Sequence, residues 1–264
     1  MSNLPFEPQW FSKPGDTLAA LMAAGSLTDT EVAARGNFDL ALVRNLLTGS
    51  VDIDDGIALR LADSVGGTSA FWLRRQSNYQ ASLERMAQSL PKELAMAWLR
   101  HFPTRELSYS GWLKQSSNRQ EMTKSCLAYF GVTGPEEWKH RYCDTVNDIA
   151  FRTSESFLSK AGPLSAWVRR GEIEAATIRT AEWNRERLIN SIPELKKLTW
   201  RKDPTKFVAE LRAVCAEAGI ALVFVRPPSG CRASGATRFV TPGRAILIQS
   251  FRYLSDDQFW FTFF

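Results

Sequence analysis

Residues Thr28–Gly49 read TDTEVAARGNFDLALVRNLLTG, and this stretch decides the fold of the N-terminal part. Thr28 and Glu31 have the T-x-x-E spacing of a capping box, in which each side chain bonds the other residue's backbone N–H. The apolar pair Val32-Ala33 follows directly. The pattern therefore predicts a helix that begins at this box and ends near Gly36.

A second short helix is predicted directly after that glycine. Gly36-Asn37 is typical of a tight turn, and Asp39 is a favoured N-cap for a helix over Leu40 to Leu47. Gly49 is placed to end this helix. Two short helices joined by a glycine turn predict a helix-turn-helix, whose second helix would be the recognition helix.

The wider segment, residues 12–80, resembles the HigA-type antitoxins of the Xre superfamily. Besides the two helices above, the resemblance is carried by Pro14-Gly15-Asp16-Thr17-Leu18, Ile57-Ala58-Leu59-Arg60-Leu61-Ala62, Phe71-Trp72-Leu73 and Asn78-Tyr79. It implies a five-helix DNA-binding domain that is often dimeric and represses its own operon.

The resemblance also implies which side chains face the DNA groove. They are Asp39, Leu40, Ala41, Arg44 and Asn45. Arg44 can pair with a guanine edge and Asn45 with an adenine edge, whereas Leu40 and Ala41 can only touch a thymine methyl. Asp39, at the helix N-terminus, would face phosphate.

Charge opposes DNA binding in this segment. Residues 1–80 contain six basic and nine acidic residues, a net charge of −3, and the remaining residues contain 27 basic and 19 acidic ones, a net charge of +8. Cationic side chains supply most non-specific DNA affinity. Two interpretations stay open: specific operator binding, and a retained fold used for dimerisation or protein contact.

Residues 81–200 are predicted to be a helical connector. Pro91 opens one helix, Gly131 closes another, and Pro135 starts a third with acids in its first turn. Five tryptophans are expected to pack in its core, namely Trp98, Trp112, Trp138, Trp167 and Trp183. Its later helices are basic, which indicates either a solvated face or a surface for phosphate or an acidic partner.

The C-terminal part, residues 201–264, is predicted to be α+β. Asp203-Pro204 starts a helix that Gly219 ends, and short apolar strands follow over 220–225, 236–240 and 245–249. Ser255 and Gln258 then form a second capping box, before the aromatic run 259–264.

This order of elements resembles the ImmA/IrrE family of zinc metallopeptidases. The phrases GCRASGATR at 230–238 and SFRY at 250–253 carry the resemblance. It implies a half-zincin: one helix, a three-stranded sheet and the start of the active-site helix, with the H-E-x-x-H motif expected beyond Phe264. The fold class is thus mainly α, with a helix-turn-helix domain (1–80), a connector (81–200) and a half-zincin (201–264).

The histidine content excludes the chemistry of that family in this chain. His101 and His140 are the only histidines, and they lack the one-turn spacing that a catalytic zinc requires. His140-x-x-Cys143 is a possible ligand pair, but no second pair accompanies it. We expect no catalytic residue, no metal ligand and no cofactor here, with zinc expected only where the H-E-x-x-H helix is present.

A strand beside a zincin active site can align an extended peptide by strand addition. The candidate substrate segment is Ser234, Gly235, Ala236, Thr237 and Arg238. Its glycine permits close backbone approach. An ordinary hairpin explains the same residues equally well.

By resemblance, the predicted function is a DNA-binding regulator of the toxin–antitoxin or stress-response type, coupled in the intact protein to a metallopeptidase. The alternatives are a peptidase whose helix-turn-helix recruits a regulatory protein, and a non-catalytic interaction module. Expected partners are operator DNA, a toxin or repressor substrate, and a second copy of the chain. Four scattered cysteines indicate the cytoplasm, and no apolar run has the length of a membrane span.

The aromatic run 259–264 generates a prediction about self-association. It contains Phe259, Trp260, Phe261, Phe263 and Phe264, and each large apolar side chain gains about 1.5–3 kcal/mol on burial. We expect the run to pack into the C-terminal part or into another chain, and self-association through the C-terminal part is the outcome we favour. Sedimentation should therefore show a smaller assembly for a variant that ends at Ser255 than for the full chain. Assemblies of equal size and equal solubility would contradict this.

Overall fold

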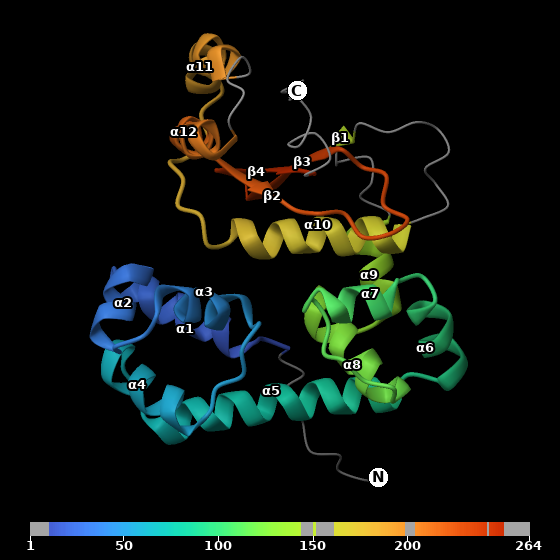
Figure 1. Cartoon of the computed structure of the whole chain (residues 1–264). Coiled ribbons are helices and arrows are strands. Elements are labelled where there is room, and N and C mark those ends of the chain that lie inside the picture. The colour runs from blue at the N-terminus through green and yellow to red at the C-terminus, as the bar shows by residue number, and fades with distance from the viewer. Residues whose placement is uncertain (1–10, 144–149, 152–160, 199–203, 242, 251–264) are drawn as a thin grey trace, which may run out of the picture. The chain divides into compact units, whose positions relative to one another are not determined.

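The computed structural model describes residues 11–143, 150–151, 161–198, 204–241 and 243–250. The chain is mainly helical, with a small mixed sheet in its C-terminal part (Figure 1). It divides into two compact units, Met1–Leu90 and Pro91–Phe264. Within the described residues, no helix has the length and apolar character needed to cross a membrane.

The N-terminal unit is built from helices. They are α1 (Pro14–Ala24), α2 (Asp29–Arg35), α3 (Leu40–Thr48), α4 (Asp55–Val65) and α5 (Ser69–Ser89). One apolar core joins them, and it includes Leu18, Val32, Val43, Leu61 and Trp72. The boundary expected at residue 80 falls inside α5, because that helix continues without a break to Ser89.

The helix ends of α2 and α3 are formed as the sequence predicts. The Glu31 N–H donates to Thr28 Oγ1 over 3.0 Å, and the Thr28 N–H donates to a Glu31 carboxylate oxygen over 2.7 Å. Asp39 caps α3 by accepting the Ala41 N–H. Gly49 ends α3 with φ of 76°, a left-handed conformation that glycine adopts without strain.

The helices at the start of the second unit surround an aromatic core. They are α6 (Lys92–Leu99), α7 (Thr104–Tyr109), α8 (Arg119–Phe130) and α9 (Pro135–Tyr142). The rings of Trp98, Phe102, Phe130 and Trp138 contact one another, mostly edge to face. Pro91, Gly131 and Pro135 stand at the helix boundaries that the sequence predicts.

The rest of this unit is a sheet between helices. Its strands are β1 (Ala150–Phe151), β2 (Ile220–Phe224), β3 (Gly235–Thr241) and β4 (Arg244–Gln249), and its helices are α10 (Ala161–Ala175), α11 (Arg185–Leu198) and α12 (Pro204–Glu217). The strand order is β1-β3-β4-β2. Strand β4 runs parallel to β2, and β3 runs antiparallel to β1 and β4.

Alternation along the strands assigns the two faces of the sheet. Leu222 and Leu247 share a core with Phe207 and Leu211 of α12. The neighbouring Ile248 faces the opposite side and packs against Gly171 of α10, where an added Cβ would overlap its side chain. Helix α10 therefore covers one face, and α12 covers the other (Figure 1).

Two features of this unit differ from the expected organisation. The three expected strands are present, but the two-residue strand β1 also joins the sheet by pairing with β3. Helix α10, assigned to the connector, packs on β2 and β4. The domain boundary expected at residue 200 therefore separates α10 from the sheet on which it packs. The predicted capping box at Ser255–Gln258 and the aromatic run 259–264 lie outside the described residues.

The contact between α1 and α3 generates a stability prediction. A Cβ added at Gly15 would overlap the backbone carbonyls of Leu46 and Leu47. We expect Gly15→Ala to lower the free energy of unfolding by about 1–3 kcal/mol, because two helices must separate.

The matched control is Gly56→Ala in α4. There an added Cβ would meet only Asp54 Oδ1, at 3.5 Å, an ordinary contact. Helix propensity should then make this change neutral or stabilising by up to about 1 kcal/mol. Urea denaturation measures both; equal effects at the two glycines would argue against the close helix contact.

Candidate functional site

The expected DNA-facing residues lie on and just before α3, with different exposures. Asp39 and Ala41 are exposed, as is Asn45, which follows Ala41 by one helical turn. Leu40 is half-buried and packs against the core of the unit. The outward face of α3 is thus short, and it is formed by Ala41 and Asn45 with Arg44 beside them.

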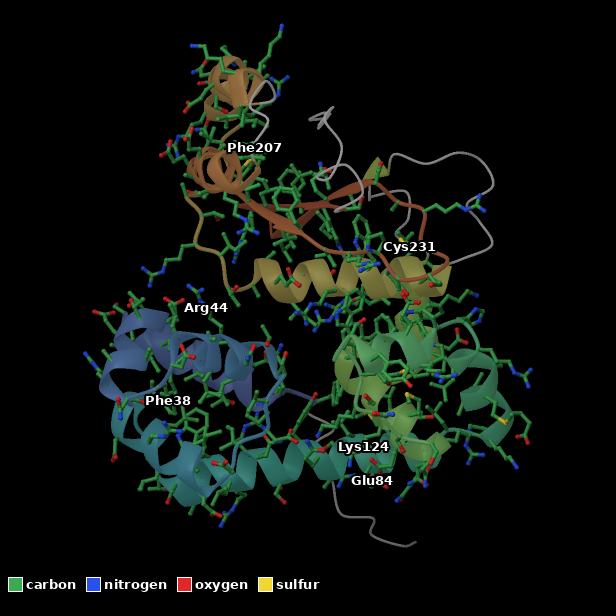
Figure 2. All side chains as sticks on the ribbon, viewed as in Figure 1. Phe38, Arg44, Glu84, Lys124, Phe207 and Cys231 are labelled. Carbon is green, nitrogen blue, oxygen red and sulfur yellow. The ribbon has the colours of Figure 1, made fainter. Side chains whose placement is uncertain are left out.

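Arg44 is engaged within the protein. Its Nε donates to Asp29 Oδ2 over 3.1 Å, which joins α3 to the first residue of α2 (Arg44 is labelled in Figure 2). The Arg44 side chain is 38% exposed, and that of Asp29 only 12%. The cation that the sequence assigns to base recognition therefore already has an anionic partner.

Arg60 of α4 contacts the turn that precedes α3. Its Nη1 donates to the Asn37 carbonyl over 3.2 Å, and its guanidinium carbon lies 4.4 Å from the centre of the Phe38 ring. Asn37 has a φ of 50°, which asparagine tolerates better than most residues. These contacts fix the direction in which α3 leaves the turn.

The candidate substrate segment Ser234–Arg238 lies at the start of β3 and within it. The Ser234 carbonyl accepts the Ser250 N–H, and Gly235 and Ala236 pair with β4. Ala236 and Thr237 also pair with β1, so at these two residues β3 has a neighbour on both sides. A role of the segment in peptide contact stays a prediction.

The Arg238 side chain belongs to a buried charge cluster. Its Nη1 donates to Glu172 Oε1 over 2.6 Å, while Arg169 Nη1 and the Tyr142 hydroxyl donate to the other Glu172 oxygen, each over 3.0 Å. Glu172 is only 7% exposed. One carboxylate therefore joins α9, α10 and β3.

The cluster changes the acid–base properties of its members. Burial raises the pKa of Tyr142, and the nearby Glu172 raises it further. Burial opposes the charge of Arg169, but Tyr142 and Glu172 outweigh this effect and raise the pKa of Arg169. Because the pKa values of Tyr142 and Arg169 are both raised, the tyrosine keeps its proton and the guanidinium its charge near neutral pH, so these two groups are suited to stabilising structure and not to proton transfer.

Sequence reasoning did not find this cluster. Arg169 belongs to the basic part of the connector, for which the sequence predicts a solvated face or a surface for phosphate or an acidic partner, but its side chain is largely buried and its Nε donates to the Tyr129 carbonyl. The i, i+3 spacing of Arg169 and Glu172 is visible in the sequence. The third partner, Arg238, is distant along the chain, and no local pattern reveals it.

The histidines are separate in the structure. His101 is exposed and stacks on Trp138 with ring centroids 5.6 Å apart, and His140 is exposed on α9. Within the described parts of the chain, no three His, Cys, Asp or Glu side chains are grouped as metal ligands. The pair His140 and Cys143 has no third ligand there.

The sequence was also compared with known proteins. No protein-family model matches this chain, and no curated protein shows a significant match to it.

The buried cluster generates a prediction about stability. Glu172→Gln removes a carboxylate that pairs with both Arg169 and Arg238, so we expect a loss of roughly 2–4 kcal/mol of unfolding free energy. The loss is smaller than for a fully buried pair, because both arginines keep some exposure. Glu174→Gln, two residues along α10, breaks the partly exposed pair with Arg170 and should cost at most about 1 kcal/mol. Similar losses in urea denaturation of both variants would rule out a central role for Glu172.

Proposed function

We propose that this chain is a DNA-binding regulator whose N-terminal unit contacts duplex DNA through α2 and α3. The observation that carries the proposal is the outward face of α3. A small residue, Ala41, and an amide, Asn45, stand one turn apart on a helix that directly follows a fixed turn. This combination lets a helix approach the major groove closely and hydrogen-bond a base edge.

The ion pair between Arg44 and Asp29 sets the expected strength of binding. Arg44 must leave Asp29 before it can pair with a guanine, and a partly exposed pair of this kind is worth about 1 kcal/mol. The acidic composition of the unit adds a general repulsion from phosphate. We therefore expect weak, salt-sensitive binding to operator DNA. Asn45 contacts a base edge, and Arg44 contacts the DNA once it has separated from Asp29.

The resemblance of residues 12–80 to HigA-type antitoxins supports a regulatory role with a protein partner, such as a toxin or a repressor. The order α12, β2, β3, β4 favours a second candidate function. It is the order expected for a metallopeptidase of the ImmA/IrrE type before its active-site helix. In that case the N-terminal unit recruits the protein to be cleaved. Cleavage of a partner by a form that includes H-E-x-x-H, without any DNA binding, would favour this second candidate.

The proposed function predicts opposite effects for the two members of the ion pair. Asp29→Asn frees Arg44, so we expect DNA affinity to rise about 2–5-fold. Arg44→Ala and Asn45→Ala should each lower it at least about 5-fold, the loss of one base contact. Selection from a random duplex pool supplies the DNA, and fluorescence anisotropy at fixed salt measures the affinities.

The charge control is Asp63→Asn, because Asp63 is exposed on α4 and its loss changes the net charge equally. We expect less than a 2-fold change for this variant. Equal gains from Asp29→Asn and Asp63→Asn would mean that net charge alone acts. Failure of the pool to yield any enriched duplex would remove the DNA-binding proposal.

A further inference from the structure

A polar cavity of about 410 Å³ lies in the second unit, where β2 ends. Its walls come from α7, from α10 and from the segment 224–228 that follows β2. Strand β2 runs parallel to β4, and the carboxyl ends of parallel strands are a common place for ligands. The volume lies within the range of small-molecule sites.

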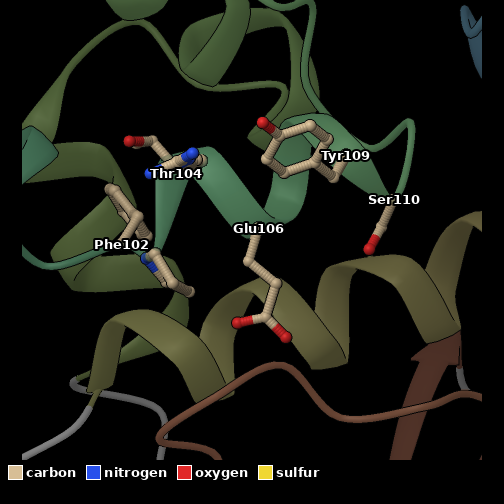
Figure 3. Close-up of a pocket in the computed structure, with 7 residues that line it drawn as sticks. Phe102, Thr104, Glu106, Tyr109 and Ser110 are labelled. Atoms are coloured by element: carbon tan, nitrogen blue, oxygen red, sulfur yellow. The ribbon is translucent and has the colours of Figure 1, made fainter.

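One wall of the cavity carries a fixed carboxylate. Glu106, which also lines the second pocket drawn in Figure 3, points from α7 toward α10 and the loop after β2. Its two oxygens accept the Ser229 N–H over 3.1 and 2.9 Å, so the carboxylate is held in place. Arg226 lies in the same loop, lines the cavity and is exposed.

A second pair of charges stands on α10. Arg170 Nε donates to Glu174 Oε1 over 2.7 Å, a bond that does not use the two terminal nitrogens of the guanidinium. The Arg170 guanidinium carbon is 5.9 Å from the centre of the Trp112 ring, which stacks on Tyr129. An aromatic surface therefore adjoins the charged groups.

The other side of the loop is held rigidly. The Val225 carbonyl accepts the indole N–H of Trp167 over 2.9 Å, and Pro227-Pro228 restricts the backbone beyond Arg226. The cavity is thus formed by fixed elements and does not need a large rearrangement to accept a ligand.

The balance of charge selects the kind of ligand. Two guanidinium groups, of Arg170 and Arg226, and two carboxylates, of Glu106 and Glu174, line one small space. A simple anion or cation would be repelled by as many of these groups as attract it. A molecule with both charges can place each beside an opposite partner. Trp112 adds an apolar surface for a side chain.

We propose that this cavity binds a zwitterionic amino acid or dipeptide. Its ammonium group faces Glu106 and Glu174, its carboxylate faces Arg226 and the terminal nitrogens of Arg170, and its side chain contacts Trp112. The proposal does not depend on DNA binding, since all these residues belong to the second unit.

Isothermal titration of the full chain tests the proposal. The probes are the twenty common L-amino acids and the glycyl dipeptides of phenylalanine, leucine and tyrosine. We expect at least one probe to bind with a Kd below about 1 mM, a binding free energy near −4 kcal/mol. Acetylating the amine or amidating the carboxylate of that probe should each weaken binding at least 10-fold.

Two variants locate the binding. Arg226→Gln removes an exposed cation, and Glu106→Gln keeps an acceptor for the Ser229 N–H while removing the charge; each should weaken binding at least 10-fold. Arg232→Gln is the control, because Arg232 is exposed in the same loop but does not line the cavity. Circular dichroism confirms that each variant is folded.

Four results would overturn the proposal. The first is that no probe binds below about 1 mM, and the second is that the blocked probes bind as tightly as the free zwitterion. The third is that the two cavity variants bind as tightly as the Arg232→Gln control. Binding of inorganic phosphate as strongly as the best amino acid would also overturn it, by showing a simple anion site.

Discussion

The carboxylate of Glu172 is the interaction on which the second unit depends. It is buried on α10, and a lone buried carboxylate would carry a large desolvation cost. Donors from three separate elements offset that cost: Arg169 on its own helix, Tyr142 at the end of α9, and Arg238 on β3. The charges can be satisfied only when these elements meet in one arrangement, so the cluster specifies how the sheet sits on α10.

Close backbone approach provides the second constraint in this unit. Gly171 follows Arg169 by two residues and lets Ile248 of β4 rest directly on α10. The same helix therefore meets β4 through an apolar contact and β3 through an ionic one. Packing fixes the distance between α10 and the sheet, and the charge cluster fixes the register of β3 above it.

Local signals in the sequence predicted the helix boundaries well, because caps and terminal glycines depend on residues within one turn. Thr28, Asp39 and Gly49 act as their patterns indicate. The three strands from residue 220 onward were also predicted, since each is a short apolar run. What local reasoning missed depends on pairs that are distant in the chain: β1 with β3, and Arg238 with Glu172.

The candidate sites also depend on contacts between residues that are distant in the sequence. Arg44 lies on α3 directly before the exposed Asn45, but the spacing of the residues gives no sign that Asp29 pairs with it. The cavity beside β2 combines residues from three segments between 106 and 228, none of which forms a motif. Such a site becomes visible only when the chain is folded.

The pairing of β1 with β3 and of β2 with β4 also determines when the chain can fold during synthesis. The N-terminal unit is made of helices that contact near neighbours, so it can form as soon as α5 has emerged from the ribosome. Helix α10 emerges much earlier than β4, and until then the side of the helix that carries Gly171 lacks the strand that packs on it. Through that interval the nascent chain has a folded first unit and a helix whose sheet-facing side is uncovered, and exposed apolar surface of this kind favours aggregation.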